Sequence, residues 1–343
     1  MEIQDRMIMS MIQGFSTSYL LYTACELGIF DCLYGGGMTL SKLSNELDTE
    51  EEVLYRLLRP LAAFNLVKED KGVFYLASLG VKLSKHPEGS LKGLVLFCGR
   101  ESMRCWSKMY EAVKLHSFPY MLVEGKPFFD AQQDDNAKFS DFNSVMRNSS
   151  KNLELSPYFE QQTNKGEALV IVDIGGGAGD IVSKFLGFYQ NAGGIIFDLE
   201  HVKSEAQKNL ESYSVNKRCE FKTGNFFREI DVKGDLFILS RILHDWEDEK
   251  ACEILKNVRK AMPENSALLV IEKILPNTIE KDCLHLYMND LYIWSVCGGK
   301  ERTEEEFLNI FGKSGLMLEK KYKLTSDEYV LEVKKKHFEE GIL

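Results

Sequence analysis

The feature that most constrains this chain is a run of apolar residues that leads directly into a glycine-rich turn. Residues 169–172 are all apolar, Asp173 follows, and glycines stand at positions 175, 176, 177 and 179. This pattern is typical of a buried parallel strand whose end turns under a helix. Because glycine has no Cβ and tolerates positive φ, the backbone there can approach a bound ligand closely. We therefore expect an α/β fold that binds a ligand at this turn.

A second apolar run, at residues 195–197, ends in Asp198, a further candidate ligand-binding residue. An acidic residue at this place can accept hydrogen bonds from both hydroxyls of a ribose, which indicates an adenosine-type cofactor. A nicotinamide dinucleotide would need glycines spaced G-x-G-x-x-G and room for a pyrophosphate, and Asp180 at the helix start disfavours that anion. The turn therefore favours S-adenosylmethionine, and a nicotinamide dehydrogenase stays as an alternative.

Length and charge exclude several classes of protein. At roughly 150 residues per domain, 343 residues predict two domains. The 42 basic and 52 acidic residues give a net charge of −10, which disfavours binding to nucleic acid. No apolar run of about 18 residues and no signal-peptide pattern is visible. The eight cysteines form no C-x-x-C pair, which favours reduced thiols over zinc sites or disulfides. We expect a cytoplasmic protein with no membrane partner.

The first 100 residues are expected to form a helical domain of their own. Residues 7–21 predict a helix with an unusually wide apolar surface, which a second subunit would cover. Helices predicted at 39–47 and 50–64 precede a hairpin predicted at 66–76. This order is typical of a winged helix. We interpret it as a dimerisation domain that makes the protein a homodimer.

A winged helix also raises the alternative of a DNA-binding regulator. The second of its helices would begin in an acidic segment, residues 48–52, which would repel phosphates. Between residues 39 and 83 there are six basic and seven acidic side chains. This balance favours dimerisation over DNA binding.

Residues 101–343 are expected to form the second domain. Helical stretches are predicted at 91–98, 102–115 and 138–155. From residue 169 onward, apolar strands alternate with helical patterns, which predicts a doubly wound parallel sheet of the Rossmann-like kind. The strands are predicted at 169–174, 194–197, 218–222, 236–239 and 268–271, and the segments 317–322 and 328–333 are expected to pair antiparallel at one edge.

His244 is the candidate general base, because it follows the fourth strand at the edge where open α/β sheets bind ligands. An ordinary pKa of about 6.5 suits histidine to proton removal at neutral pH. Glu272 follows the fifth strand and Glu301 lies in a turn before a helix. Either carboxylate could bind Nδ1–H, fix the tautomer and stabilise the imidazolium. No cluster of metal ligands is visible, so we expect a reaction without a metal.

Five ordered motifs carry a resemblance to a known family. They are Asp-Ile-Gly-Gly-Gly-Ala-Gly at 173–179, Phe-Asp-Leu-Glu-His-Val at 197–202, Gly-Asn-Phe-Phe at 224–227, His-Asp-Trp-Glu-Asp-Glu at 244–249 and Gly-Gly-Lys-Glu-Arg-Thr at 298–303. In this order they resemble the plant-type small-molecule O-methyltransferases. That family includes caffeate and flavonoid enzymes, the hydroxyindole (acetylserotonin) enzyme, and bacterial phenazine and aromatic polyketide enzymes. The similarity runs nearly end to end. It implies a Rossmann-like S-adenosylmethionine-dependent methyltransferase domain with an N-terminal winged-helix dimerisation domain.

The resemblance also assigns residues to the cofactor. Gly175, Gly176 and Gly177 would lie under the methionine portion of S-adenosylmethionine, while Asp198 would hold the ribose and Leu199 would lie beside the adenine. Further cofactor contacts are implied for Ser150, Gly224, Asn225, Phe226, Ser240 and Arg241. The family usually has Asp at position 225. An amide oxygen can still accept from the adenine amino group, so Asn225 is compatible with binding.

For the reaction, the resemblance makes His244 the base with Glu272 and Glu301 beside it. A phenol with a pKa of about 10 is a poor nucleophile until its proton is removed. Retention of all three residues disfavours an inactive relative, while N- or C-methyl transfer on the same fold stays open. The expected acceptor is a planar aromatic hydroxyl compound, and catechol, indole, phenazine and anthraquinone types all fit. Its candidate contacts are Phe97, Trp106, Met146, His285, Met288, Asn289 and Trp294.

Overall fold

The computed structural model describes residues 3–87, 89–134, 140–163 and 168–336, and the chain divides into two compact units. The first unit comprises Met1–Ser107 and Ala137–Asn148, and the second comprises Lys108–Asn136 and Ser149–Leu343. The chain therefore passes between the units three times. Helix α11 (Ser140–Asn152) begins in the first unit and ends in the second. The expected domain boundary at residue 100 stays a prediction.

The first unit is built on helices and a small antiparallel sheet. Strand β3 pairs with both β1 and β2, and the Thr39 side chain caps α3 by accepting from the backbone N–H of Lys42 at 3.3 Å. The predicted order of two helices and a hairpin is confirmed. The elements are α1 (Ile3–Leu27), α2 (Ile29–Tyr34), β1 (Met38–Thr39), α3 (Leu40–Glu46), α4 (Glu51–Ala63), β2 (Val67–Asp70), β3 (Val73–Leu76), α5 (Ser78–Val81), α6 (Lys92–Phe97), the π-helical turn η1 (Cys98–Ser102) and α7 (Met103–Trp106).

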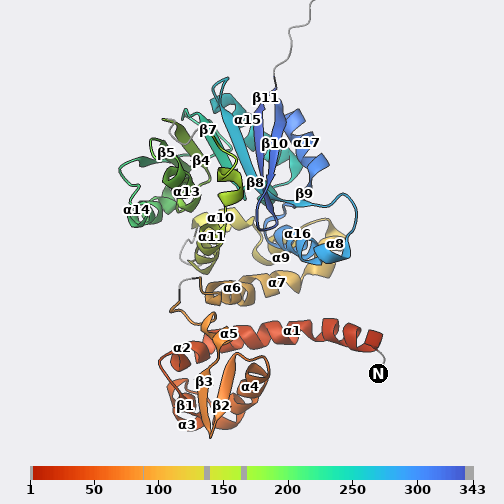
Figure 1. Ribbon diagram of the computed structural model, residues 1–343. Coiled ribbons are helices and arrows are strands. Elements are labelled where there is room, and N and C mark those ends of the chain that lie inside the picture. The colour runs from red at the N-terminus through yellow and green to blue at the C-terminus, as the bar shows by residue number, and fades with distance from the viewer. Residues whose placement is uncertain (1–2, 88, 135–139, 164–167, 337–343) are drawn as a thin grey trace, which may run out of the picture. The chain divides into compact units, whose positions relative to one another are not determined.

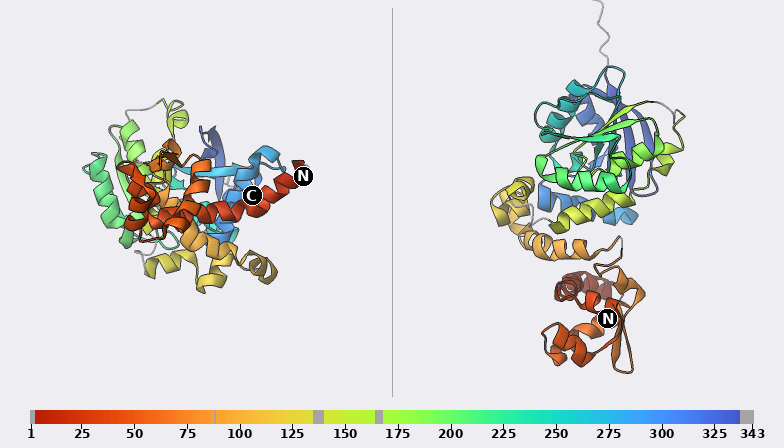
Figure 2. Two further views of the ribbon diagram at one scale, coloured as in Figure 1. Left: turned by 90° about the horizontal axis from the view of Figure 1, so that it is seen from below. Right: turned by 90° about the vertical axis from the view of Figure 1, so that its left-hand side faces the viewer.

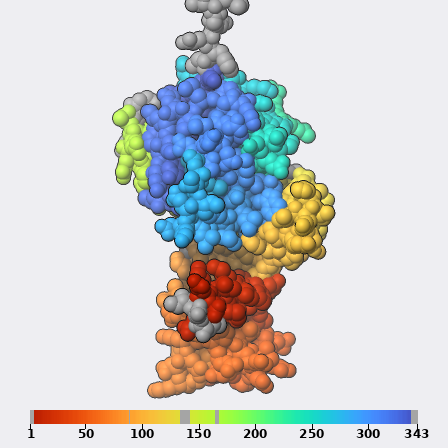
Figure 3. Space-filling model, turned by 90° about the vertical axis from the view of Figure 1, so that its right-hand side faces the viewer, coloured from red at the N-terminus to blue at the C-terminus, as the bar shows by residue number. Residues whose placement is uncertain are grey.

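Helix α1 is longer than its predicted range and leaves one apolar surface uncovered in the single chain. Its C-terminal part is anchored in the unit's core, where Ala24 and Cys25 are buried. Toward the other end Met11, Ile12 and Phe15 are each more than half exposed, at 65 %, 58 % and 65 %. Figure 3 shows the start of α1, in red, at the surface of the first unit. An apolar surface of this kind marks an interaction site.

The prediction of one continuous helix over residues 102–115 is wrong. Helix α7 ends at Trp106, and α8 (Met109–Leu115) begins only after Lys108, whose φ of −102° and ψ of 7° leave the helical region. Two further short helices follow in the second unit, α9 (Pro119–Glu124) and α10 (Phe128–Asp134). These four-to-seven-residue helices have too few turns for a periodic apolar pattern to reveal them.

The second unit is organised around an eight-stranded sheet in the order β10-β11-β8-β7-β4-β5-β6, with β9 paired to β8. The five strands from β8 to β6 are parallel, as expected. Antiparallel pairing of the last two strands is confirmed, but β11 lies inside the sheet against β8 and only β10 is at the edge. The strands are β4 (Val170–Ile174), β5 (Gly193–Asp198), β6 (Cys219–Thr223), β7 (Leu236–Ser240), β8 (Ala267–Leu275), β9 (Arg302–Thr303), β10 (Leu316–Lys323) and β11 (Glu328–Lys335).

Helices cover both faces of this sheet, as Figures 1 and 2 show. Alternate strand residues explain the two layers: Val172 and Phe237 pack with α15 and α17, whereas Ile171 and Ile238 pack with α13 and α14. The helical elements are α12 (Ser156–Phe159), α13 (Asp180–Phe188), η2 (Glu200–Val202), α14 (Lys203–Ser212), η3 (Leu243–Asp245), α15 (Asp248–Ala261), η4 (Lys281–Cys283), α16 (Leu284–Cys297) and α17 (Glu304–Lys313).

Strand β4 lies between β5 and β7, so the strand order reverses there. In open α/β sheets the carboxyl ends of the strands at such a point form the ligand site. The glycine turn follows β4, Asp198 ends β5, and His244 follows β7. Among the described residues, no helix combines the length and the apolar character needed to cross a lipid bilayer.

Candidate active site

The glycine turn after β4 has a backbone that only glycine adopts without strain. Gly175, Gly177 and Gly179 have φ values of 68°, 54° and 80°. A Cβ on Gly176 would lie 2.7 Å from the carboxyl carbon of Asp173, whereas a Cβ on Gly177 would meet no atom within 4 Å. A Cβ on Gly175 or Gly179 would also come within 2.6 Å of an isoleucine side chain, so among these four glycines Gly177 alone leaves open space, as far as the described residues show, where a ligand can approach the backbone.

Asp198 is joined directly to this turn. One of its carboxylate oxygens accepts from the backbone N–H of Gly177 at 2.8 Å, and the other accepts from that of Leu199 at 2.7 Å. Burial raises the pKa of Asp198, while these two hydrogen bonds oppose the rise. The structure thus brings together the turn and the acid that the sequence singled out for one cofactor.

The segment after β6 borders the same place. The backbone N–H of Gly224 donates to the carbonyl of Asp198 at 2.9 Å, and a Cβ on Gly224 would collide with the Phe197 ring. The side-chain oxygen of Asn225 accepts from the backbone N–H of Phe227 at 2.9 Å, which fixes the turn. The Phe226 ring lies beside Gly175, within 3.5 Å of the position of a Cβ there.

The end of β7 gathers three further cofactor candidates. The hydroxyl of Ser240 is buried and has no hydrogen-bond partner among the described residues. Arg241, at a positive φ of 55°, donates to the hydroxyl of Ser150 at 3.3 Å and to that of Ser149. Burial lowers the pKa of Arg241. The structure therefore places Ser150 at the carboxyl end of β7, although 90 residues separate it from Ser240 in the sequence.

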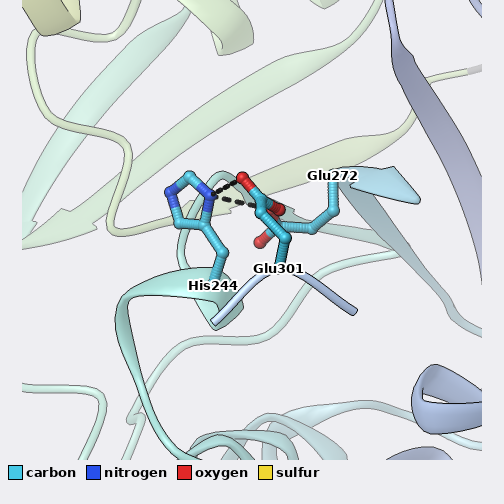
Figure 4. A group of neighbouring side chains, drawn as sticks. All are labelled: His244, Glu272 and Glu301. Atoms are coloured by element: carbon cyan, nitrogen blue, oxygen red, sulfur yellow. Dashed lines mark hydrogen bonds and ion pairs between the residues drawn. The ribbon is translucent and has the colours of Figure 1, made fainter. Parts of the chain in front are cut away.

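His244 lies in η3, directly after this strand end. Its Nδ1 is 3.1 Å from a carboxylate oxygen of Glu301 and 3.5 Å from one of Glu272. The imidazole is 13 % exposed and both glutamate side chains are fully buried. Figure 4 shows the second ring nitrogen directed away from the two glutamates. That nitrogen, Nε2, is 3.6 Å from the carboxylate of Asp245.

The charges around His244 decide its protonation. Burial alone would lower the pKa of His244, but the negative charges of Glu272, Asp245 and Glu301 outweigh it and raise the pKa to about 10. Burial also raises the pKa of Glu272 above its usual range and that of Asp245 to about 6. The carboxylates therefore favour the imidazolium, and the neutral imidazole becomes more populated as the pH rises.

The two glutamates bind different partners. Oε1 of Glu272 accepts from the backbone N–H groups of Ile242 and Leu243 at 3.0 and 2.8 Å, so it mainly holds the turn. Oε1 of Glu301 lies in hydrogen-bond contact with Nδ1 of His244 and also accepts from the side-chain amide of Asn289 at 2.7 Å. Glu301 is thus the hydrogen-bond partner of Nδ1, a choice that the sequence left open. Asn289, expected at the acceptor, contacts this partner.

His244, Glu272 and Glu301 also present atoms within 4.8 Å of one another, a spacing that a metal ion could use. Oε1 of Glu301 already accepts protein hydrogen bonds, whereas Oε2 of Glu272, its oxygen nearest to Nδ1, has no hydrogen-bond partner among the described residues. The reaction without a metal stays a prediction.

The other acceptor candidates are dispersed. On α16, Met288 is exposed, Trp294 is half-buried, and His285 is exposed with its Nε2 3.0 Å from the Asp327 carboxylate. Among the described contacts, Asn289 alone of the seven is joined to the His244 cluster. The remaining candidates, Phe97, Trp106 and Met146, belong to the first unit.

Sequence reasoning missed two neighbours of the cluster. Asp290 accepts from the backbone N–H of Glu301 at 2.8 Å, and Arg302 is fully buried beside it. Arg302 follows Glu301 within the same quoted motif, so its position was a usable signal. The burial of Arg302 could not be predicted from the sequence, because arginine is mostly an exposed residue.

The fold and the glycine turn define an α/β enzyme with an adenosine-type cofactor at the switch point of its sheet. Comparison with known families identifies residues 106–317 as an O-methyltransferase domain and residues 9–85 as an O-methyltransferase dimerisation domain. The chain therefore belongs to the O-methyltransferase family whose members use S-adenosylmethionine. The predicted family, enzyme class and cofactor are confirmed, which decides against a dehydrogenase and a DNA-binding regulator.

Individual relatives agree with this assignment. The phenazine O-methyltransferase PhzM of Lysobacter antibioticus is 30 % identical over 322 residues, which cover 91 % of each chain. The solved structure of LaPhzM has a TM-score of 0.90 at 28 % identity and covers 97 % of this chain and 100 % of its own. A phenazine-1-carboxylate N-methyltransferase of Pseudomonas aeruginosa is 26 % identical and covers 92 % of each chain.

Proposed function

We propose that this enzyme methylates a hydroxyl group of a planar aromatic small molecule, with His244 as the general base and without a metal. The observation that carries the proposal is the pairing of His244 Nδ1 with Glu301 at 3.1 Å. This pairing fixes the tautomer and leaves Nε2 to accept a proton from the acceptor. A relative that acts on a phenazine supports a planar aromatic acceptor.

The residues at the strand ends fit the cofactor. Among the described residues, Gly177 has open space beside it and the Ser240 hydroxyl has no hydrogen-bond partner, and both features suit the methionine portion. Asp198 would exchange its bond to the Gly177 N–H for the ribose hydroxyls, and Asn225 would contact the adenine. Further contacts are proposed for Ser150, Gly175, Gly176, Leu199, Gly224, Phe226 and Arg241. When bound, S-adenosylmethionine supplies an electrophilic methyl group.

The chain's own residues must accept the proton that the acceptor hydroxyl loses. An acceptor hydroxyl has a pKa of about 10, and the surrounding carboxylates raise the pKa of His244, which favours proton transfer to the neutral imidazole. Nε2 accepts the proton, and the buried carboxylates of Glu301 and Glu272 stabilise the imidazolium that results. Orientation of the two reactants supplies much of the remaining rate, up to several kcal/mol.

Acceptor contacts are proposed first for Asn289, because its amide already reaches Glu301. Met288 and Trp294 lie on the same helix, α16. We also propose a homodimer through the dimerisation domain, because α1 exposes an apolar surface there. A cytoplasmic location agrees with the absence of a disulfide among the described residues.

N-methylation is a second candidate, since one relative is an N-methyltransferase. A ring nitrogen with a free lone pair needs no base to become a nucleophile. The buried His244–Glu301 pair would then have no proton to accept, and it therefore favours a hydroxyl acceptor.

The first test is calorimetric titration with S-adenosylhomocysteine, followed by a screen of aromatic hydroxyl compounds for the mass of one added methyl group. We expect binding by the wild type, loss of binding in Asp198→Ala, and methylated products whose formation needs His244 and survives a metal chelator. Products methylated only on nitrogen, or full activity of His244→Ala, would refute the proposal.

A further inference from the structure

Arg302 is a fully buried arginine beside the proposed base. Its exposed fraction is 0 %, and it lies in β9, where it pairs with Ile274 at the end of β8. It directly follows Glu301, the partner of His244. A charge this deeply buried persists only where the protein supplies partners for all of it.

The guanidinium finds these partners on the turn that carries His244. Nη1 donates to the carbonyl of Leu243 and Nη2 to the carbonyl of Trp246, each at 2.7 Å. Nε donates to the carboxylate of Asp248 at 3.1 Å, and Nη2 lies 3.0 Å from the same oxygen. The two carbonyls come from residues on either side of His244, so one side chain spans the turn.

The turn itself has weak internal hydrogen bonds. The backbone N–H groups of Asp245 and Trp246 reach the carbonyls of Ile242 and Leu243 only at 3.3 Å. At the other end, Glu272 accepts from the N–H groups of Ile242 and Leu243. Buried side chains therefore hold the turn from both ends: Glu272 accepts from its backbone N–H groups, and Arg302 donates to its carbonyls.

We propose that Arg302 is a positioning residue for His244, and that its guanidinium holds the turn where Nδ1 meets Glu301. The proposal rests on the proposed role of His244 as the base. Full burial keeps the guanidinium away from the acceptor, so it acts through the turn. Lysine cannot replace it, because one ammonium group cannot donate to two separated carbonyls and a carboxylate in the planar geometry of a guanidinium.

The main test compares Arg302→Lys with the wild type. We expect Arg302→Lys to bind S-adenosylhomocysteine within about twofold of wild type and to lose about 10- to 100-fold in kcat, because a base displaced by about 1 Å loses that much. The pH dependence of kcat/KM should also shift, because Nδ1 no longer meets Glu301 in the same geometry. A folded Arg302→Lys with an unchanged kcat and pH profile would overturn the proposal.

Guanidinium rescue separates positioning from folding. Addition of guanidinium chloride at low millimolar concentration should restore part of the kcat of Arg302→Ala and none of that of Glu301→Ala. Restored thermal stability without restored kcat would mean that Arg302 serves folding alone, and would overturn the proposal.

Two variants of the surrounding ion pairs complete the design. Lys300 also pairs with Asp248, and Lys300→Met should leave kcat unchanged. If Lys300→Met lost as much kcat as Arg302→Lys, the specific role of Arg302 would be contradicted. If the Arg302 variants do not fold, Asp248→Asn is the substitute test, because it removes the charge of the guanidinium's ion-pair partner at a partly exposed residue. We expect it to lose a few-fold in kcat, and an unchanged kcat would overturn the proposal.

Failure of the base assignment can be distinguished from failure of this inference. With histidine labelled by nitrogen-15, the spectrum of His244→Gln assigns the signal of His244 among six histidines. If His244→Gln is fully active, the proposed function fails, while a changed Nδ1 signal in Arg302→Lys still supports positioning. If His244→Gln is inactive and the Nδ1 signal is unchanged in Arg302→Lys, the positioning role alone fails.

Discussion

The glycine turn after β4 and the His244 turn after β7 stand at the same edge of one sheet but are held in different ways. The glycine turn is shaped by its own backbone, and its link to Asp198 spans 21 residues. The His244 turn is held by side chains from 29 to 59 residues away, those of Glu272 and Arg302. We therefore expect that the proposed cofactor contacts of the glycine turn depend on a local motif, whereas the proposed proton transfer by His244 depends on contacts between distant segments.

This difference implies that binding and chemistry can be damaged separately. Substitutions at the glycine turn and Asp198 should weaken cofactor affinity and spare the base. Substitutions around His244 should lower the rate and spare cofactor affinity. The predictions below test this separation.

The largest effect is expected from His244→Ala. Loss of a general base should lower kcat by about 10²- to 10⁴-fold, while calorimetric affinity for S-adenosylhomocysteine stays within about twofold because the His244 imidazole is not among the proposed cofactor contacts. His116→Asn, at a positive φ of 53° that Asn tolerates, is the matched control. A parallel loss of cofactor affinity in His244→Ala would break the separation.

Asp198→Ala should weaken binding of S-adenosylhomocysteine by about 100-fold, because two charge-assisted hydrogen bonds to a ribose are lost. At saturating cofactor its kcat should recover to within a few-fold of wild type. Asp198→Asn, which keeps one acceptor oxygen for the ribose hydroxyls, should lose less. If kcat stays low at saturating cofactor, Asp198 also contributes to the reaction itself, which would contradict the separation of cofactor binding from proton transfer.

Glu301→Gln should lower kcat by about 10- to 100-fold and shift the pH profile. The acidic neighbours raise the pKa of His244 to about 10, and the neutral imidazole is the active base, so kcat/KM of the wild type rises with pH up to that range. Removing one negative charge lowers this pKa, so the midpoint should move to lower pH in Glu301→Gln. An unchanged midpoint would show that Glu301 does not set the charge state of the base.

The smallest effect is expected from Asn225→Asp, which restores the usual family residue. Its side chain can still accept from the Phe227 N–H, the bond that fixes the turn. A carboxylate accepts more strongly from the adenine amino group, so affinity for S-adenosylhomocysteine should rise by about two- to tenfold, with kcat unchanged. Weaker binding would mean that Asn225 is required by the turn itself.

The same contrast explains what the sequence could predict. The parallel sheet, the hairpin and the glycine turn follow from local patterns, and their positions were close to those observed. The interior place of β11 did not follow, because it depends on pairing with a distant strand. The break at Lys108 did not follow, because the short helices on either side have too few turns for a periodic pattern. At the site, the sequence named Glu272 and Glu301 together, but only the fold shows that Glu272 binds backbone and Glu301 binds the imidazole.

The three passages of the chain between its units restrict how such enzymes can recombine. Residues 137–148 belong to the first unit although they follow residues of the second, and there Asn148 donates to the Ser90 carbonyl at 3.2 Å while Phe142 packs on Phe97. A single crossover after Ser107 would join one parent's N-terminal segment to the other parent's α11. Exchange of this unit between relatives therefore requires both segments to be inherited together.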